Sequence, residues 1–208
     1  MARDTVVSDK NIVRLDDDSE DKDSKGPISS IAEKYFFDSR VVMITGQITH
    51  TLAERVCLSL FALAQASDDP ITVIISSPGG HVESGDMVHD MIKFIKPRVR
   101  VLGSGWVASA GALIYIAAEK EDRYVLNNTR FLLHAPSGGV GGTATDIAIQ
   151  AREINLMRDR LNQLFATATG QPLEKVEKDT DRDFWLSADE AVAYGLATHI
   201  ISKQSEIT

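Results

Sequence analysis

Short apolar runs alternate with amphipathic stretches along the chain from about residue 40. Runs rich in β-branched and aliphatic residues predict buried strands, at 41–45, 71–75, 98–102, 129–134 and 197–201. The stretches between them carry apolar residues at helical spacing. Because apolar strands joined through helices need crossover connections, the sequence predicts an α/β fold with a largely parallel sheet that is covered on both faces.

Local signals set the expected ends of these helices. Thr51 to Glu54 and Ser187 to Glu190 have the spacing of capping boxes and should open a helix each. A helix through Met87, Met91 and Ile95 must stop before Pro97, and a short apolar helix is expected over 113–118.

The longest predicted helix runs from about Thr145 to Thr169, with Gly170 and Pro172 as stop signals. At 1.5 Å per residue it would span roughly 36 Å, longer than a domain of this size needs. Its apolar stripe (Ile147, Ile154, Leu161) is typical of an intramolecular core. The glycine-rich run before it, 137–142, instead favours a helix that projects and packs on another subunit, and both interpretations stay open.

Composition separates an arm from a domain. Residues 1–27 are polar and acidic and are expected to form a flexible arm with at most a weak strand at 11–15, whereas 28–208 should be one domain. The net charge of −8 over 208 residues argues against binding to nucleic acid through phosphate attraction. No signal sequence or membrane-length apolar run is found, so a cytoplasmic protein that does not enter the membrane is expected. The single cysteine, Cys57, is interpreted as buried filler.

The sequence excludes several kinds of site or gives only weak signals for them. The sequence has no GxxxxGK[ST] phosphate loop, so this chain should not hydrolyse ATP. Gly103-Ser104-Gly105 lacks the third glycine of a dinucleotide fingerprint. His81 and His89 would lie on similar helix faces, but without a third ligand they are more simply structural histidines.

Ser109 is the candidate nucleophile. It follows a strand and a run of small residues and precedes a helix, whose free N–H groups would favour developing negative charge. The same small residues would also suit tight packing of a helix on the sheet. His134 and Asp183 supply a possible base and carboxylate, and Pro78-Gly79-Gly80 could aim a backbone N–H at an oxyanion. A serine, a histidine and a carboxylate are the minimum for acyl transfer at neutral pH.

These residues belong to a set of motifs by which the chain, from about 40 to 201, resembles the proteolytic subunit of the Clp protease family (ClpP). The set is specific only as a whole. It comprises Ser77-Pro78-Gly79-Gly80, Ala108-Ser109-Ala110-Gly111-Ala112, Asn128-Thr129-Arg130, His134, Ala144 to Ile147, Ala151 to Ile154, Thr169 to Leu173, Glu177 to Asp183, Ser187 to Ala191, and Tyr194-Gly195-Leu196.

The resemblance implies a crotonase-like spiral of ββα units with a handle region at about 135–169 that interlocks two heptameric rings. It implies ATP-dependent proteolysis in which a separate AAA+ unfoldase uses the ATP, so this chain needs no cofactor. Mapped onto this sequence, Ser109 would be the nucleophile, His134 the base and later the acid, and Asp183 the orienting carboxylate. The N–H groups of Gly80 and Ala110 would form the oxyanion hole, and polypeptides would be the substrates.

The sequence departs from the family pattern at several positions, among them Ser76, Ala110, Ala135, the handle residues Val140, Gly141 and Thr143, and Thr72 and Ile74 at the expected unfoldase-docking cleft. The main hypothesis is a serine endopeptidase subunit of a homo-oligomer. A second hypothesis is a ring scaffold or paralogue that needs another ClpP-type subunit for activity. A third is an acyl-CoA enzyme of the crotonase fold, since a fold does not fix a function.

Overall fold

The computed structural model describes residues 27–208 except Gly138 and Val140. The expected arm (apart from Pro27) and its weak strand therefore lie outside the described residues. The helices are α1 (Pro27–Asp38), α2 (His50–Ala66), α3 (Val82–Phe94), α4 (Ala110–Tyr115), α5 (Ala144–Thr169), α6 (Leu173–Thr180) and α7 (Ala188–Tyr194). The strands are β1 (Val41–Thr45), β2 (Ile71–Ser77), β3 (Val99–Ala108), β4 (Arg123–Leu126), β5 (Arg130–Leu133), β6 (Phe184–Ser187) and β7 (His199–Ile201).

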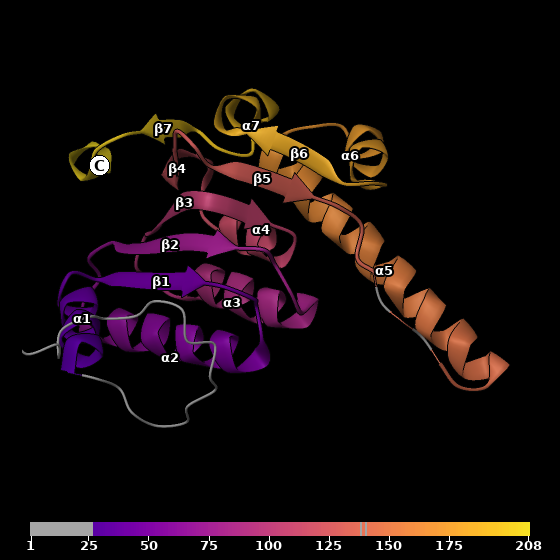
Figure 1. Ribbon diagram of the computed structural model, residues 1–208, viewed down its shortest axis with the longest axis horizontal. Coiled ribbons are helices and arrows are strands. Elements are labelled where there is room, and N and C mark those ends of the chain that lie inside the picture. The colour runs from indigo at the N-terminus through magenta and orange to yellow at the C-terminus, as the bar shows by residue number, and fades with distance from the viewer. Residues whose placement is uncertain (1–26, 138, 140) are drawn as a thin grey trace, which may run out of the picture.

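The strands form one sheet in the order β1-β2-β3-β4-β7, with β5 beside the end of β3 and β6 beside β5 (Figure 1). All pairs are parallel except β5 with β6, which is antiparallel. The predicted α/β class and largely parallel sheet are confirmed. The antiparallel β6 lies in a segment that the apolar pattern left unassigned.

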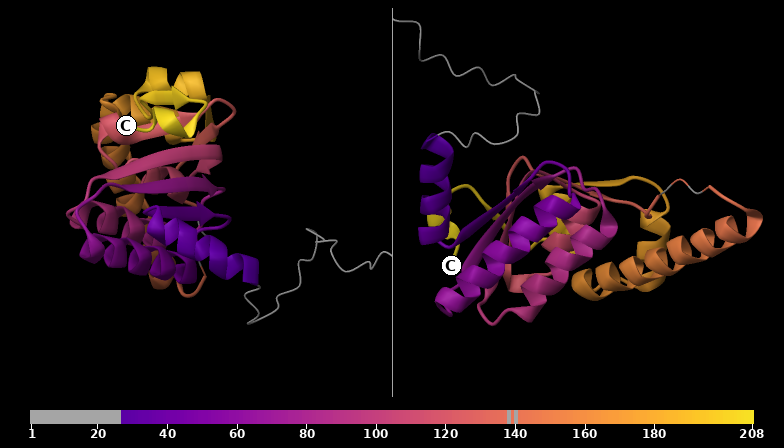
Figure 2. Two further views of the ribbon diagram at one scale, coloured as in Figure 1. Left: turned by 90° about the vertical axis from the view of Figure 1, so that its left-hand side faces the viewer. Right: turned by 90° about the horizontal axis from the view of Figure 1, so that it is seen from below.

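The prediction that the sheet is covered on both faces is wrong for part of the second face. In β2, Ile71, Val73 and Ile75 are fully buried, whereas Thr72 and Ile74 line an open groove of about 720 Å³ on the other face. The two further views in Figure 2 show α2 and α3 together on one side of the sheet. Strands added in the order β1-β2-β3-β4 with crossovers of one hand place every crossover helix on the same face. The second face is only flanked, by α1 and the C-terminal segment.

The N-cap of helix α2 lies two residues before the predicted one, at Thr49 instead of Thr51. The Thr49 hydroxyl accepts a hydrogen bond from the Leu52 N–H at 3.2 Å. The preceding residue, Ile48, is already fixed by a parallel bridge to Gly80. The chain can therefore turn into the helix immediately, and Thr51 falls inside the first turn.

The third predicted strand is longer than expected, and the short apolar helix starts earlier. β3 continues through the glycine-rich residues to Ala108, because its far half pairs with β5 rather than β4. The positive φ of Gly105 allows the strand to change partners. Helix α4 then starts at Ala110 instead of Leu113. The run of small residues before Ser109 is therefore part of β3 and not a connection after the predicted strand.

Helix α5 projects from the body, as Figures 1 and 2 show. Its buried residues all come from the last third, starting with Leu161, whereas Ile147 is 41% exposed. Of the two interpretations of its apolar stripe, the structure thus favours the projecting helix. The packing of that stripe on another subunit stays a prediction. The helix begins at Ala144, one residue before the predicted start. A capping box between Thr143 and Asp146 opens it.

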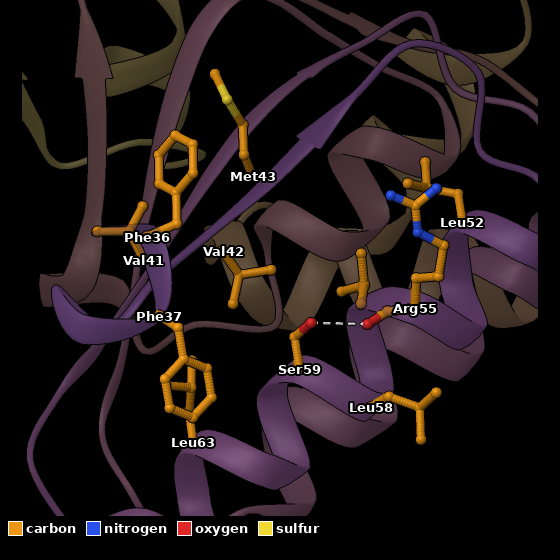
Figure 3. Close-up of a pocket in the computed structure, with 11 residues that line it drawn as sticks. Phe36, Phe37, Val41, Val42, Met43, Leu52, Arg55, Leu58, Ser59 and Leu63 are labelled. Atoms are coloured by element: carbon orange, nitrogen blue, oxygen red, sulfur yellow. Dashed lines mark hydrogen bonds between the residues drawn. The ribbon is translucent and has the colours of Figure 1, made fainter. Parts of the chain in front are cut away.

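A second open groove, of about 520 Å³, lies between α1, β1 and α2 (Figure 3). Phe36 and Phe37 from α1, Met43 from β1 and Leu58 from α2 line it with exposed apolar surface. By contrast, Cys57 is buried, as predicted, and burial raises the pKa of its thiol. Within residues 27–208, the described helices include none with the length and apolar character to span a bilayer.

Candidate active site

Ser109 occupies a strained turn between β3 and α4. Its φ of 53° and ψ of −121° lie where residues other than glycine are rarely found. Such a conformation costs about 1–3 kcal/mol and persists only where the surroundings impose it. Here the Ser109 N–H donates to the Leu132 carbonyl at 2.9 Å, which ties the turn to β5. The side chain remains partly exposed at the start of a helix.

The loop after β2 packs directly on this turn. A Cβ at Gly79 would lie 2.6 Å from the Ser109 Cβ and 2.7 Å from the Ala108 carbonyl oxygen. The φ of Gly79 is +92°, so both the space and the backbone require glycine. The expected proximity of Pro78-Gly79-Gly80 to Ser109 is therefore found.

Two backbone N–H groups near Ser109 are left out of the local hydrogen bonding. The bridge between Ile48 and Gly80 uses the Gly79 carbonyl and the His81 N–H, so the Gly80 N–H is not part of it. Ala110 is the first residue of α4, where N–H groups have no partner inside the helix. Both are the amides that the family resemblance suggests for an oxyanion hole.

His134 and Asp183 are brought together by the antiparallel pair β5 and β6. The last ladder pair is Leu133 with Phe184, so His134 and Asp183 face each other one step further on. His134 Nδ1 lies 3.5 Å from Asp183 Oδ1. The His134 side chain is 29% exposed and that of Asp183 65%. Nε2 is the ring nitrogen left for a second partner.

Polar contacts that the sequence analysis missed support this pair. The Ala135 N–H donates to the Thr180 carbonyl at 2.7 Å. The Thr180 hydroxyl in turn lies 2.9 Å from Asn162 Oδ1, and both side chains are buried. Asn162 is, with Thr169, one of the two polar residues among the buried residues of α5, and its place between Leu161 and Phe165 was the available signal.

Ser109 and His134 line the same small cavity of about 20 Å³. Ala110, Leu113, Leu133, Leu161 and Phe165 complete most of its wall. In the part of the chain that the structure describes, no hydrogen bond joins the Ser109 hydroxyl to the His134 ring. Catalytic hydrogen bonds are often long before a substrate binds. The arrangement brings a hydroxyl and an imidazole to one cavity and sets a carboxylate against that imidazole, which is the set of groups that acyl transfer needs.

The structure gives no support to a metal site at the other histidines. His81 Nδ1 lies 2.8 Å from the Ser84 hydroxyl, and His89 Nδ1 lies 3.0 Å from Asp90. Among the residues described, no three His, Cys, Asp or Glu side chains are grouped as metal ligands would be.

Comparison with known proteins gives consistent results. The family model described as Clp protease matches residues 24–204. The chain is 59% identical to ATP-dependent Clp protease proteolytic subunit 3 of Rhizobium meliloti, covering 94% of this chain and all of that protein. It is 55% identical to proteolytic subunit 2 of Pseudomonas aeruginosa, covering 93% of this chain and 96% of that protein.

Solved structures of ClpP1 from Listeria monocytogenes have the same fold. One matches with a TM-score of 0.78 and 51% identity, and a mutant of that protein with 0.80 and 52%. Both comparisons cover 85% of this chain and 99% of the other. The predicted spiral architecture is therefore supported by relatives of known structure.

Proposed function

Since the chain belongs to the Clp protease family, a family of serine peptidases, we propose that it cleaves polypeptides through Ser109, His134 and Asp183. The observation that carries the assignment of residues is their convergence. Ser109, in its strained turn, and His134, facing Asp183, line one cavity although they are distant in the sequence.

In this mechanism Ser109 Oγ attacks the substrate carbonyl carbon while His134 Nε2 accepts the hydroxyl proton. Asp183 faces Nδ1 and stabilises the imidazolium that forms. His134 then protonates the leaving amine, and an acyl group remains on Ser109. Water, deprotonated by the same histidine, hydrolyses this ester. His134 carries every proton transfer, so no cofactor enters the reaction.

The oxyanion of each tetrahedral intermediate would receive the N–H groups of Gly80 and Ala110. Removing one such donor typically costs about 10²–10³ in rate. The fit of Gly79 against Ser109 supports this assignment, because it holds the Gly80 amide close to the nucleophile.

The proposal includes an assembly of two stacked heptameric rings in the cytoplasm, fed by an AAA+ unfoldase that uses the ATP. The exposed apolar residues of α5, such as Ile147 and Leu156, support contact with another subunit. The groove between α1, β1 and α2 offers a further apolar surface for a neighbour in the ring (Figure 3).

Substitution of Ser109 tests the proposal. The assembled wild-type protein should react with a fluorophosphonate at Ser109 and hydrolyse peptides, whereas Ser109→Ala should do neither and should assemble normally. Mass spectrometry of the labelled peptide and of the native assembly provides both measurements. Peptide hydrolysis by a clean Ser109→Ala preparation would refute the assignment.

A second candidate is a paralogue subunit that needs another ClpP-type subunit for activity. The relatives named above carry the numbers 2 and 3, and Ser109 is not hydrogen-bonded to His134 within the described residues. In that case the homo-oligomer would not label, and labelling of Ser109 would begin only after a second ClpP-type subunit is added.

A further inference from the structure

The open groove on the second face of the sheet combines an apolar lining with positive charge. It measures about 720 Å³ and lies between α1 and the C-terminal segment, which are at the same end of the sheet (Figure 1). Arg100 of β3 and Lys203 line it, and none of the described residues that line it is Asp or Glu. Its apolar lining comes mainly from the sheet (Ile74, Leu102, Leu126, Ile201) and from α1 (Tyr35, Phe36).

The positive charge of this groove lacks a partner in the part of the chain that the structure describes. Arg100 Nε is buried and donates to no acceptor there. Buried N–H groups without an acceptor are rare in folded proteins because they are destabilising. The Glu206 carboxylate, three residues after Lys203, is already used, since it accepts from the N–H groups of Ser202 and Lys203 at 2.8 and 3.3 Å. The groove therefore suits an acidic ligand with an apolar part.

The groove between α1, β1 and α2 suits such a ligand less well. It is smaller, at about 520 Å³. Arg55 is the one cation among the described residues that line it, and this side chain is exposed. An acidic segment would find less charge to neutralise there.

The arm carries the complementary pattern in its sequence. Ile12, Val13 and Leu15 are apolar, and Asp16-Asp17-Asp18 follows directly. Residues 16–23 contain six acidic side chains and one lysine. A short apolar group beside a run of carboxylates matches an apolar groove that carries two cations.

The arm is also long enough to reach the groove. Ala32 of α1 lines the groove and lies five residues after Pro27, about 7.5 Å along the helix. The nine residues from Asp18 to Pro27 can extend over about 30 Å, whereas the 12 residues of α1 span about 18 Å. Asp18 can therefore lie beside any part of the groove that α1 borders.

We propose that residues 12–18 dock in this groove of their own chain, with their apolar side chains against its apolar lining and Asp16 to Asp18 beside Arg100 and Lys203. The short connection to α1 favours the arm of the same chain, because a tether keeps the local concentration of the segment high. Ile74 lines the same groove, so the docked segment would cover the cleft expected for an unfoldase. Docking itself does not depend on the proposed peptidase activity, and either can fail without the other.

Carbodiimide coupling of the assembled full-length protein tests the contact, after intact mass has confirmed that residues 1–26 are present. The reagent activates a carboxylate, and Lys203 Nζ displaces the activated group to form an amide, with net loss of one water. Peptide mapping should find Asp16, Asp17 or Asp18 joined to Lys203, and the denatured product should have the mass of one chain less that water. A link to Lys203 that gives the mass of two chains would place the arm on a second copy and overturn the proposal.

Lys96 supplies both controls for the coupling reaction. It forms an ion pair with Asp68 and its side chain is 78% exposed, so an amide between these two shows that the reagent has worked. The arm should not couple to Lys96, which does not line the groove. Two results would overturn the proposal: no link from the arm to Lys203 while Lys96 couples to Asp68, or equal coupling of the arm to Lys96 and Lys203.

Substitutions within the arm separate docking from chance encounters of a tethered chain. Ile12→Ser, Val13→Ser and Leu15→Ser together leave every carboxylate in place but remove the apolar contacts. The initial rate of coupling to Lys203 should fall about tenfold or more. The pair Val6→Ser and Val7→Ser is the matched control and should leave the rate unchanged. A rate that the triple substitution does not change would contradict docking in the groove.

Substitution of Arg100 tests the charged part of the contact. Arg100→Gln should lower the initial rate of coupling to Lys203 about threefold or more and weaken its dependence on salt. Arg55→Gln, in the groove between α1, β1 and α2, should change neither the rate nor its salt dependence. Equal effects of the two substitutions would contradict the role of Arg100 and with it the choice of this groove.

Discussion

The Thr180 hydroxyl lies 2.9 Å from the Asn162 side-chain oxygen and joins α6 to the buried end of α5. The same hydroxyl lies 2.9 Å from the Val176 carbonyl, so its single proton is shared between two acceptors. The Thr180 carbonyl accepts from the Ala135 N–H, next to His134. Because Thr180 also precedes Asp183 by three residues, this contact connects the projecting helix to both members of the His134–Asp183 pair.

Removing the Thr180 hydroxyl should therefore affect stability and turnover together. Thr180→Val leaves the buried Asn162 without a partner, at an expected cost of about 1–3 kcal/mol in unfolding free energy. The His134 segment would lose part of its support, so kcat for peptide hydrolysis should fall while KM changes little. Chemical denaturation and steady-state kinetics of the assembled protein check the two effects.

Thr167→Val is the matched control, because Thr167 is an exposed threonine of α5 whose hydroxyl donates to the Gln163 carbonyl. Thr167→Val should change neither the unfolding free energy nor kcat measurably. A Thr180→Val protein that is destabilised but retains full kcat would show that the contact is structural only and does not position His134.

The contact of Gly79 with Ser109 makes a second prediction. Gly79→Ala places a methyl group within 2.6 Å of the Ser109 Cβ and requires alanine at φ +92°. The loop must move away, carrying the Gly80 amide with it, so peptide hydrolysis should fall by about 10²-fold or more. Gly139→Ala, where an added Cβ meets nothing within 4 Å, should retain wild-type rates. Activity of Gly79→Ala within a few-fold of wild type would argue against the Gly80 amide as an oxyanion donor.

Arg123 is buried and satisfies three carbonyl groups at the ends of two helices. Its guanidinium donates to the carbonyls of Ile116 and Ala118 after α4 and of Ala168 in α5, at 3.2, 2.9 and 2.7 Å. Burial lowers the pKa of Arg123, but these helix C-termini favour a cation. The residue holds the base of α5 against the body.

Arg123→Met should lower the unfolding free energy by about 3 kcal/mol or more, because three buried acceptors lose their donor. Arg123→Lys should restore little of the lost stability, because the ammonium group of lysine cannot donate in the planar arrangement of the guanidinium. Arg152→Met, at an exposed position of α5, serves as the control. Thermal unfolding at one fixed protein concentration compares the variants. An Arg123→Lys protein as stable as wild type would show that the planar guanidinium is not required.

β1, β2 and the first half of β3 were predictable because each is a continuous run of apolar, mostly β-branched residues, whereas the parallel strand β4 between β3 and β7 was not predicted. The segments that the sequence left unassigned depend on distant partners. β6 carries Trp185 at an exposed position and is a strand only because it pairs with β5. α6 has a polar sequence with two buried residues, Val176 and Thr180. The partly open second face of the sheet could not be predicted from the strands, because some residues on that face, such as Ile74, are apolar too.

For the candidate site, local sequence supplied the residue types but not the geometry. The small residues around Ser109 fit tight packing and a nucleophile equally well, and only the backbone angles show the strained turn. The pairing of His134 with Asp183 depends on the register of β5 against β6, which no short-range signal sets. Phe165 in the cavity wall was indistinguishable from any core aromatic.

The capping box of α5 predicts a response to acid. The Asp146 carboxylate accepts from the Thr143 hydroxyl at 2.7 Å and from the Thr143 N–H at 2.9 Å, and these bonds hold the pKa of Asp146 below its ordinary value of 3.8. A carboxyl with a lowered folded pKa stabilises the cap above its unfolded pKa, and this stabilisation is lost as the pH falls through the folded value. The tip of α5 should therefore stay capped at pH 5 and fray below about pH 3.8.

Hydrogen exchange of the amides at 143–147, corrected for the intrinsic effect of pH, measures this fraying. Asp146→Ala should show fast exchange at pH 5 already and little further change on acidification. The amides of β2, whose strand lies in the buried core and has no carboxylate cap, report whether acid acts on the whole fold. Acid-induced exchange at 143–147 that is identical in wild type and Asp146→Ala would show that the carboxylate does not hold the start of α5.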